Sequence, residues 1–179
     1  MTEVTPRFFE DYVAGQTFTF GNYAMSESEI ISFATAYDPQ PFHLQRQPPL
    51  HAAHHELIAS GWHTAAVTMR LLVDHIVPEE AILPSPGCDE LRFHRPVKPE
   101  DRLAVRLTVI DARPSQTKPD RGIVRWKVET LNQRGELVMS LISINFFRRR
   151  VRETPSGSSR GGGFVDPLPV SRPGVPSKM

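Results

Sequence analysis

Residues 62–76 read Trp-His-Thr-Ala-Ala-Val-Thr-Met-Arg-Leu-Leu-Val-Asp-His-Ile, and this stretch decides the fold. Apolar residues occupy most of its helical circumference. A helix of that kind is expected to be enclosed by other elements rather than to lie on a surface. Gly61 precedes the stretch, and Pro78 ends it because proline cannot continue a helix. We therefore predict one long, enclosed helix over 62–76.

The chain after this helix has the character of β-strands. In residues 103–110 and 122–131, apolar side chains alternate with polar ones, which is typical of strands with one buried face. Residues 87–97 and 137–147 complete the set, and residues 133–136 have the composition of a turn. Strands that follow one another through short connections favour an antiparallel sheet.

One more strand and a short helix come before the long helix. Residues 16–24 are rich in Thr, Phe and Tyr and are predicted to form a strand. The sequence Ser26-Glu27-Ser28-Glu29 is a capping box, so a helix is predicted over 27–37. Pro39 and Pro41 disfavour helical geometry in the residues before them. We therefore expect residues 38–43 to form a loop, followed over 44–55 by chain that is irregular or holds at most a short turn of helix.

These elements fit together in one way. A curved, five-stranded antiparallel sheet wrapped around a long central helix accommodates all of them, which is the hot-dog architecture of the α+β class. We assign residues 6–150 to this single domain. Residues 151–179 hold five of the 17 prolines and are expected to be a flexible Gly/Pro/Ser-rich tail. A sheet with one helix leaves an edge uncovered, so we expect a homodimer or a dimer-based oligomer.

The composition of the 179-residue chain excludes several classes of function. With 21 Lys and Arg against 20 Asp and Glu, the net charge of +1 gives no reason to expect nucleic acid as a partner. The single cysteine, Cys88, excludes an intrachain disulfide and a Cys-based zinc site, so we expect a reducing, cytoplasmic location. No signal peptide and no membrane span are expected, because no long apolar run occurs.

Four short motifs resemble one known family. They are Phe9-Glu10-Asp11-Tyr12-x-x-Gly15-Gln16, Asp38-x-x-Pro41-x-His43, Ile58-Ala59-Ser60-Gly61 and Arg95-Pro96-Val97-x-Pro99-x-Asp101. Over about residues 8–148 the chain is similar to the MaoC-like dehydratases, the hot-dog group that includes (R)-specific enoyl-CoA hydratases. The resemblance implies reversible addition of water to a trans-2-enoyl-CoA, which gives (R)-3-hydroxyacyl-CoA. It implies that the substrate is an acyl-CoA and that the reaction uses neither a metal nor a redox cofactor.

The resemblance also implies roles for particular residues. Asp38 and His43 match the family's catalytic Asp and His. Ser60-Gly61 matches the small-residue–Gly step before the central helix, where an amide helps to bind the thioester carbonyl.

Three positions depart from the family pattern. Tyr37 replaces Gly, Gln40 replaces Asn, and Ser60 replaces His. We expect these changes to reshape the pocket around the catalytic pair. They leave a branched or dicarboxylic acyl group open as the substrate.

The residue types suit this chemistry when taken by themselves. Hydration needs a base for the water proton, an acid for C2, and donors for the enolate oxygen. Asp38 and His43 stand five apart on a proline-stiffened loop and can converge on one water. The amides of Gly61 and Trp62 begin the long helix, where partial positive charge suits an enolate. Gln40 is expected to orient the water or a polar substrate group, or else to cap the loop.

Two other clusters have competing interpretations. His51, His54, His55 and Glu56, with His63 nearby, have spacings that can suit a metal, but a solvated polar segment without metal is expected. Arg148, Arg149, Arg150 and Arg152 form either a solvated strand end or an attraction for the CoA phosphates, and residues 118–122 can serve the same purpose as a hairpin tip.

Two alternatives to a hydratase stay open at this point. A hot-dog thioesterase would use a carboxylate and an amide-bearing helix end in the same way. A non-catalytic acyl-CoA-binding module would keep the scaffold with an idle site, and fold alone does not exclude it.

Overall fold

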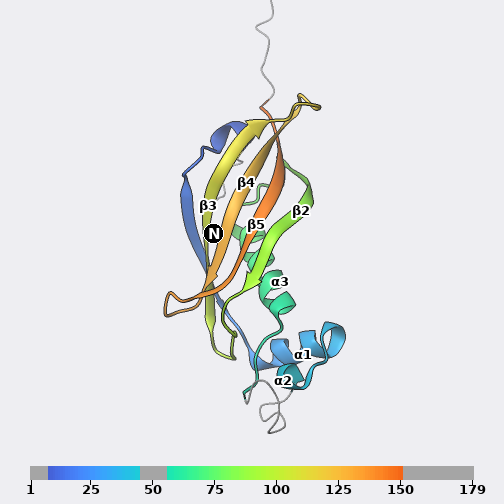
Figure 1. Cartoon of the computed structure of the whole chain (residues 1–179), viewed down its shortest axis with the longest axis vertical. Helices are drawn as coiled ribbons and strands as arrows, with labels where there is room; N and C mark the ends of the chain where they lie inside the picture. Colours follow the sequence, from blue (N-terminus) through green and yellow to red (C-terminus); the bar gives the residue numbers. More distant parts are fainter. Residues whose placement is uncertain (1–7, 45–55, 151–179) are drawn as a thin grey trace, which may run out of the picture.

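A curved antiparallel sheet and one long helix make up most of the computed structural model, which describes residues 8–44 and 56–150 (Figure 1). The strand order is β1-β3-β4-β5-β2, and every neighbouring pair is antiparallel. The strands are β1 (Thr17–Ala24), β2 (Ile82–Phe93), β3 (Arg102–Pro114), β4 (Arg121–Leu131) and β5 (Leu137–Arg148). The helices are η1 (Phe9–Asp11), α1 (Glu27–Tyr37), α2 (Pro41–Leu44) and α3 (Gly61–His75). The predicted α+β hot-dog architecture is confirmed.

The core lies between α3 and the inner face of the sheet. Alternate residues of β3 face it and are at most 1% exposed: Leu103, Val105, Leu107 and Val109. Strand β4 contributes Val124, Trp126 and Val128, also at most 1% exposed. Helix α3 meets them with Val67, Leu71 and Leu72. A buried hydrogen bond of 2.8 Å between the hydroxyls of Thr68 and Thr130 also joins the helix to the sheet.

The expectation that the long helix is enclosed on all sides is wrong for the single chain. Helix α3 buries one side against the sheet, while Trp62, Met69 and Val73 on another side are 61%, 56% and 51% exposed. One sheet can cover only one side of a helix, so the remaining apolar side chains face outward. Met69 and Val73 stand seven and eleven residues after Trp62, so the three side chains form one stripe along α3.

The predicted short helix before the site is confirmed. The Ser26 hydroxyl accepts a hydrogen bond from the Glu29 amide at 3.2 Å, and the Glu29 carboxylate accepts one from the Ser26 amide at 3.3 Å. This capping box starts α1 at Glu27, and the helix ends at Tyr37 as predicted.

The prediction of a loop over residues 38–43 needs a correction. Pro41 is the first residue of α2, a single helical turn that carries His43. Proline is tolerated at the first helical position, because the missing amide hydrogen has no intrahelical acceptor there. The residues predicted as irregular over 45–55, and those at 6–7 and 151–179, lie outside the described residues. The predicted domain limits therefore stay a prediction.

Strand β2 starts earlier than predicted. We expected it at Gly87, but it begins at Ile82 and includes Pro84 and Pro86. Among the described strands it pairs only with β5, so it lies at the edge of the sheet, where a proline need not break a ladder. Prolines in the sequence therefore hid the first part of this strand.

The two ends of the molecule carry different elements. Helices α1 and α2 and the start of α3 lie at one end, and η1 with the β3–β4 connection lies at the other (Figure 1). In the part of the chain that the structure describes, no helix is long and apolar enough to cross a membrane.

Leu71→Ala tests the packing of α3 on the sheet. Leu71 is 4% exposed, so its truncation should lower the free energy of unfolding by about 2–5 kcal/mol. The matched control is Arg70→Ala on the same helix, whose exposed ion pair with Asp74 should be worth about 0–1 kcal/mol. Urea denaturation at one fixed protein concentration measures both. Equal losses in the two variants would contradict the described core.

Candidate functional site

Asp38 is held at the end of α1 by three hydrogen bonds. Its amide donates to the Ala34 carbonyl at 2.9 Å, which fixes the backbone as the cap of the helix. Its carboxylate accepts from Gln40 Nε2 at 2.7 Å and from Ser60 Oγ at 2.7 Å, one donor on each oxygen. The side chain is 19% exposed, so the carboxylate is largely removed from solvent and has a fixed direction.

The hydrogen bonds to Asp38 set its ionisation. The amide of Gln40 contributes most and the hydroxyl of Ser60 next, and together they lower the pKa of the Asp38 carboxyl below its ordinary value. Partial burial opposes this change but does not cancel it. Asp38 is therefore a carboxylate at neutral pH, able to accept a proton.

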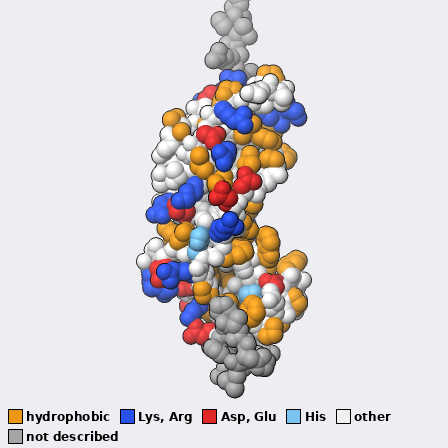
Figure 2. Space-filling model, in the orientation of Figure 1, with side chains coloured by type: hydrophobic (Ala, Val, Ile, Leu, Met, Phe, Trp, Pro, Cys, Tyr) orange, Lys and Arg blue, Asp and Glu red, His pale blue; other side chains and the backbone are white. Residues whose placement is uncertain are grey.

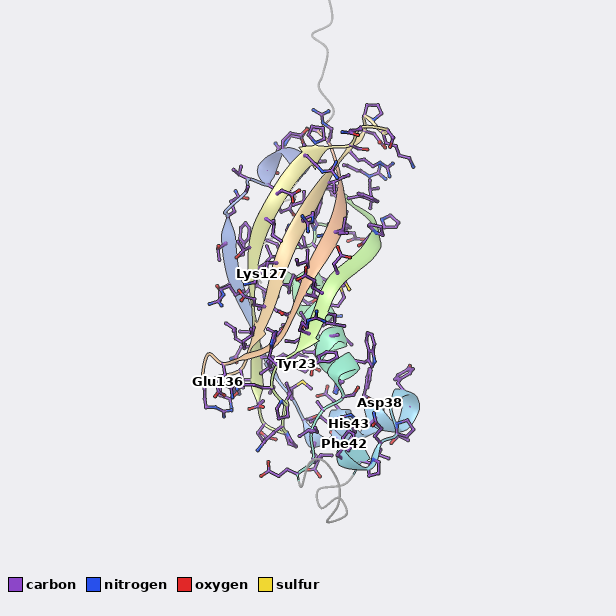
Figure 3. The ribbon with its side chains drawn as sticks, in the orientation of Figure 1. Tyr23, Asp38, Phe42, His43, Lys127 and Glu136 are labelled. Atoms are coloured by element: carbon purple, nitrogen blue, oxygen red, sulfur yellow. The ribbon has the colours of Figure 1, made fainter. Side chains whose placement is uncertain are left out.

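His43 lies on α2 and faces Asp38 (Figure 3). Its ring is buried, and Nδ1 lies 2.8 Å from the Ile58 carbonyl oxygen. A carbonyl oxygen only accepts, so Nδ1 carries a hydrogen and donates it. Nε2 then lies 3.4 Å from Asp38 Oδ2, and it is the ring nitrogen left to exchange a proton. The structure therefore brings the two predicted catalytic side chains together.

The start of α3 adds two main-chain amides to the site. Ser60 is the N-cap of the helix, and its hydroxyl oxygen accepts from the Trp62 amide at 3.2 Å. The Gly61 amide has no acceptor among the residues that the structure describes. Of the two amides predicted for the thioester oxygen, only that of Gly61 is thus left without a partner. A free amide at a helix N-terminus favours negative charge.

A cavity of about 260 Å³ reaches His43 and Gly61. Most of its wall is apolar, and the walls are built by residues from α2, α3, β2, β5 and the segments beside them: His43, Ile58, Ala59, Gly61, Thr64, Phe93, His94, Arg95, Pro96, Val97 and Val138. The Phe93 ring rests on Gly61, where an added Cβ would lie 2.5 Å from Phe93 Cε2. Glycine is needed at this step because it lets the ring close one side of the cavity.

Sequence reasoning missed two contributors to the site. The Ile58 carbonyl orients His43, but a main-chain oxygen leaves no side-chain signal in a sequence. Phe93 was expected only as a strand residue, and it reaches the site from β2, far along the chain. Arg95 also lines the cavity, although its place in one of the family motifs did not predict this.

The residues considered for a metal do not form a cluster in the described structure. Glu56 pairs with Lys98, and His63 is buried with its ring stacked on Phe33 at a centroid distance of 4.8 Å. Burial lowers the pKa of His63, which favours its neutral form. His51, His54 and His55 lie outside the described residues.

Comparisons with known proteins agree with the fold and the motifs. A MaoC-like dehydratase from Rhodospirillum rubrum is 40% identical, with a TM-score of 0.75 over 81% of this chain and 99% of that chain. An uncharacterised protein of Bacillus subtilis is 26% identical over 125 residues, which are 70% of this chain and 87% of that protein. A mesaconyl-CoA hydratase of Haloarcula marismortui is 32% identical over 94 residues, 49% of this chain and only 26% of that protein.

The match to a family model covers most of the described domain. Residues 11–131 match the model of the MaoC-like domain. This range contains Asp38, His43, Ser60 and Gly61, and it is well over half of the chain. The protein therefore belongs to the MaoC-like domain family.

Proposed function

We propose that the protein is an enoyl-CoA hydratase, or 3-hydroxyacyl-CoA dehydratase in the reverse direction. The observation that carries this proposal is the approach of Asp38 Oδ2 to His43 Nε2 at 3.4 Å, where His43 lines the same cavity as Gly61. A carboxylate next to an imidazole suits proton transfer to and from a single water that both groups can reach. The likeness to a MaoC-like dehydratase and to a mesaconyl-CoA hydratase supports the same reaction class.

The chemistry follows from these positions. A water that hydrogen-bonds to both Asp38 and His43 loses a proton to this pair, and its oxygen forms a bond to C3 of the enoyl group. The electron pair of the C2–C3 double bond moves toward the thioester, whose oxygen gains charge beside the Gly61 amide. C2 then takes a proton from the pair, which gives the (R)-3-hydroxyacyl product. Acid–base groups contribute about 10²–10⁴-fold and an oxyanion donor about 10²–10³-fold.

The cavity supports a short acyl group. Its volume of about 260 Å³ is below the range of roughly 300–1,000 Å³ that is usual for ligand pockets. Arg95 and His94 line it and are cationic or polar, so a branched or dicarboxylic acyl group is accommodated better than a long straight chain. Neither a metal nor a redox cofactor takes part in the proposed reaction.

Asp38→Asn and His43→Gln test the acid–base pair. Each variant keeps the shape of the side chain but removes its proton transfer, so kcat for hydration should fall by about 10²–10⁴-fold. Purified protein is assayed on a panel of short straight, branched and dicarboxylic enoyl-CoAs. Glu79→Gln, an exposed acid after α3, is the matched control and should keep full activity. Retained activity in both site variants would refute the mechanism.

The same assay separates the other two functions considered for this fold. Release of free thiol without loss of the double bond would identify a thioesterase. Binding of acyl-CoA without any turnover would identify a non-catalytic module.

Ser60→Ala tests how the carboxylate is kept ionised. Removing the hydroxyl donor should raise the pKa of Asp38, so the acidic limb of the kcat/KM profile should move to higher pH. Loss of the helix cap can lower the stability of the variant, but it does not shift the acidic limb of the kcat/KM profile. Ser28→Ala on the exposed side of α1 is the control. An unmoved limb in Ser60→Ala would contradict the role of this hydrogen bond.

We also propose that two copies pair through β2 and α3. Hydrophobic side chains gather on the side of the molecule that carries these elements (Figure 2). Strand β2 is a sheet edge with mostly exposed residues, and the stripe of Trp62, Met69 and Val73 lies on α3. An exposed edge beside an apolar stripe is a site for strand addition. Pairing of identical edges about a two-fold axis makes the two β2 strands antiparallel.

Cys88 reports this pairing because it is exposed near the middle of β2. A bismaleimide should join two chains through Cys88, and Cys88→Ser should abolish the product. Val73→Glu should shift the protein to monomer in analytical ultracentrifugation, because it buries a charge in the interface. Arg102→Glu, exposed near the other edge of the sheet, is the charge-changing control. A wild-type protein that sediments as a monomer at micromolar concentration would contradict the proposed dimer.

A further inference from the structure

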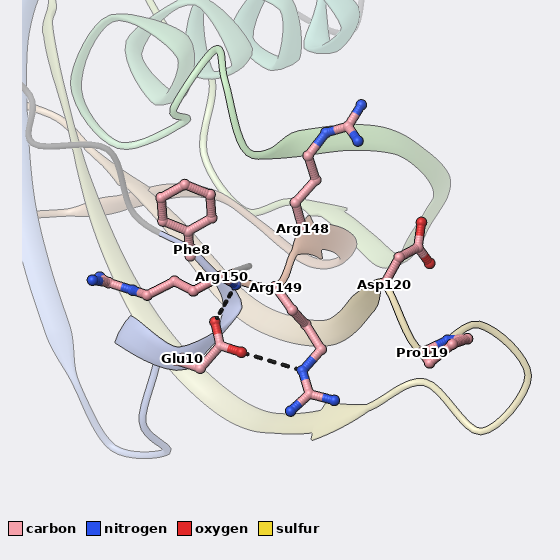
Figure 4. Close-up of a pocket in the computed structure, with 7 residues that line it drawn as sticks. All are labelled: Phe8, Glu10, Pro119, Asp120, Arg148, Arg149 and Arg150. Carbon is pink, nitrogen blue, oxygen red and sulfur yellow. Dashed lines mark hydrogen bonds and ion pairs between the residues drawn. The ribbon is translucent and has the colours of Figure 1, made fainter. Parts of the chain in front are cut away.

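A second cavity, of about 490 Å³, lies where the end of β5 meets η1 and the β3–β4 connection (Figure 4). Its wall carries three consecutive arginines, and the residues that line it are Phe8, Glu10, Pro119, Asp120, Arg148, Arg149 and Arg150. Nothing in the proposed reaction uses this cavity.

The backbone of the three arginines is fixed by three different parts of the chain. The Arg148 amide donates to the Ala81 carbonyl at 2.8 Å, and the Arg149 amide donates to the Asp120 carbonyl at 2.9 Å. The Arg150 amide donates to the Glu10 carboxylate at 3.0 Å. The guanidinium groups therefore project from a preorganised stretch of chain, which lowers the entropy that a ligand has to overcome.

The acidic groups of the cavity already have cationic partners. Glu10 accepts from Arg149 Nε at 3.2 Å, and Asp120 pairs with Arg121 at 2.8 Å. Arg150 pairs with Asp11, and its guanidinium lies 5.4 Å from the centre of the Phe8 ring.

Arg148 differs from its two neighbours. Within the described residues it has no ion-pair partner, and its side chain is exposed and directed away from the Glu10 carboxylate (Figure 4). Among the described residues, the Arg148 guanidinium is thus one positive charge without an ion-pair partner at this end of β5, whereas Arg149 and Arg150 are held by Glu10 and Asp11. Such a group matches phosphate oxygens.

The cavity is too far from Asp38 and His43 of the same chain to hold part of the same substrate directly. Phe147, next to Arg148, pairs with Ile82 at the start of β2, whereas Phe93 at the end of β2 lines the reaction cavity. At about 3.3 Å per residue, the 12 residues of β2 separate the two cavities by roughly 35–40 Å.

Antiparallel pairing of two β2 strands removes this separation. It directs the start of one β2 toward the end of the other, and therefore brings Arg148 of one copy toward the end of the other β2, where Phe93 lines the reaction cavity. We propose that Arg148 binds a phosphate group of the CoA whose acyl group occupies the reaction cavity of the other copy. The inference rests on the proposed function and on the proposed dimer. The pantetheine arm, which carries no phosphate, would cross the interface between them.

Titration with CoA tests the phosphate site without any reaction. Isothermal titration of the wild-type protein, Arg148→Ala and Arg113→Ala should show a Kd about tenfold higher for Arg148→Ala only. Arg113 is exposed near the end of β3, just before the β3–β4 connection, but it does not line the cavity. It therefore controls for general electrostatic attraction. Pantetheine should bind all three proteins alike. An unchanged Kd in Arg148→Ala, or an equal loss in Arg113→Ala, would overturn the proposal.

Mixed dimers test whether the arginine acts across the interface. Arg148→Ala is unfolded and refolded with a large excess of Asp38→Asn, so that nearly every Arg148→Ala chain pairs with an Asp38→Asn chain. In a mixed dimer, the chain with Arg148→Ala keeps its own Asp38 and receives Arg148 from the other chain. The mixture should therefore recover the wild-type KM for enoyl-CoA, although Arg148→Ala alone has a raised KM. A mixture that keeps the raised KM would overturn the crossed arrangement.

The two experiments separate the failure of this inference from that of the proposed function. If the wild-type protein hydrates no enoyl-CoA, the proposed function fails. The CoA titration then decides by itself whether Arg148 binds phosphate.

Discussion

The hydroxyl of Ser60 joins the fold to the proposed acid–base pair. Its oxygen accepts from the Trp62 amide and so starts α3, while its hydrogen is donated to Asp38 Oδ2. The same residue therefore determines where the central helix begins and where the carboxylate points. Packing of α3 against the sheet sets the position of Ser60. The Ser60 hydroxyl in turn orients the Asp38 carboxylate toward His43. Precise placement of this kind is what acid–base catalysis needs, since the proton has to move over a short distance.

A second constraint comes from the geometry of one sheet and one helix. The sheet covers one side of α3 and leaves its apolar stripe and the edge of β2 exposed. Burial of that stripe against a second copy would remove apolar surface from water at about 25 cal/mol per Å². The uncovered side of the fold and the two distant cavities are thus related: the arrangement that buries the stripe also brings opposite ends of two chains together.

Local signals in the sequence predicted most of the fold. The capping box at Ser26 gave the start of α1, and alternation gave β3 and β4, because these features depend on neighbours in the chain. The start of β2 was missed since Pro84 and Pro86 resemble a break, and only the position at the sheet edge makes them acceptable. The exposed side of α3 was missed because an apolar circumference does not reveal which partner covers it.

The site was predictable only in part for the same reason. Asp38 and His43 lie in a short motif, and the structure brings their side chains together. The Ile58 carbonyl and the Phe93 ring reach the site through the tertiary fold, from 15 and 50 residues beyond His43, and no local pattern marks them. A contact that depends on distant backbone positions cannot be read from spacing.

The three departures from the family pattern now have distinct physical meanings. Tyr37 is 77% exposed and packs against Phe33, so it does not line the reaction cavity. Gln40 and Ser60 both donate to the Asp38 carboxylate. These two replacements therefore act on the ionisation and direction of the Asp38 carboxylate more than on the shape of the cavity. Under the proposed function, selection of the acyl group falls to the cavity wall around Phe93 and Arg95, which contains none of the three replaced residues.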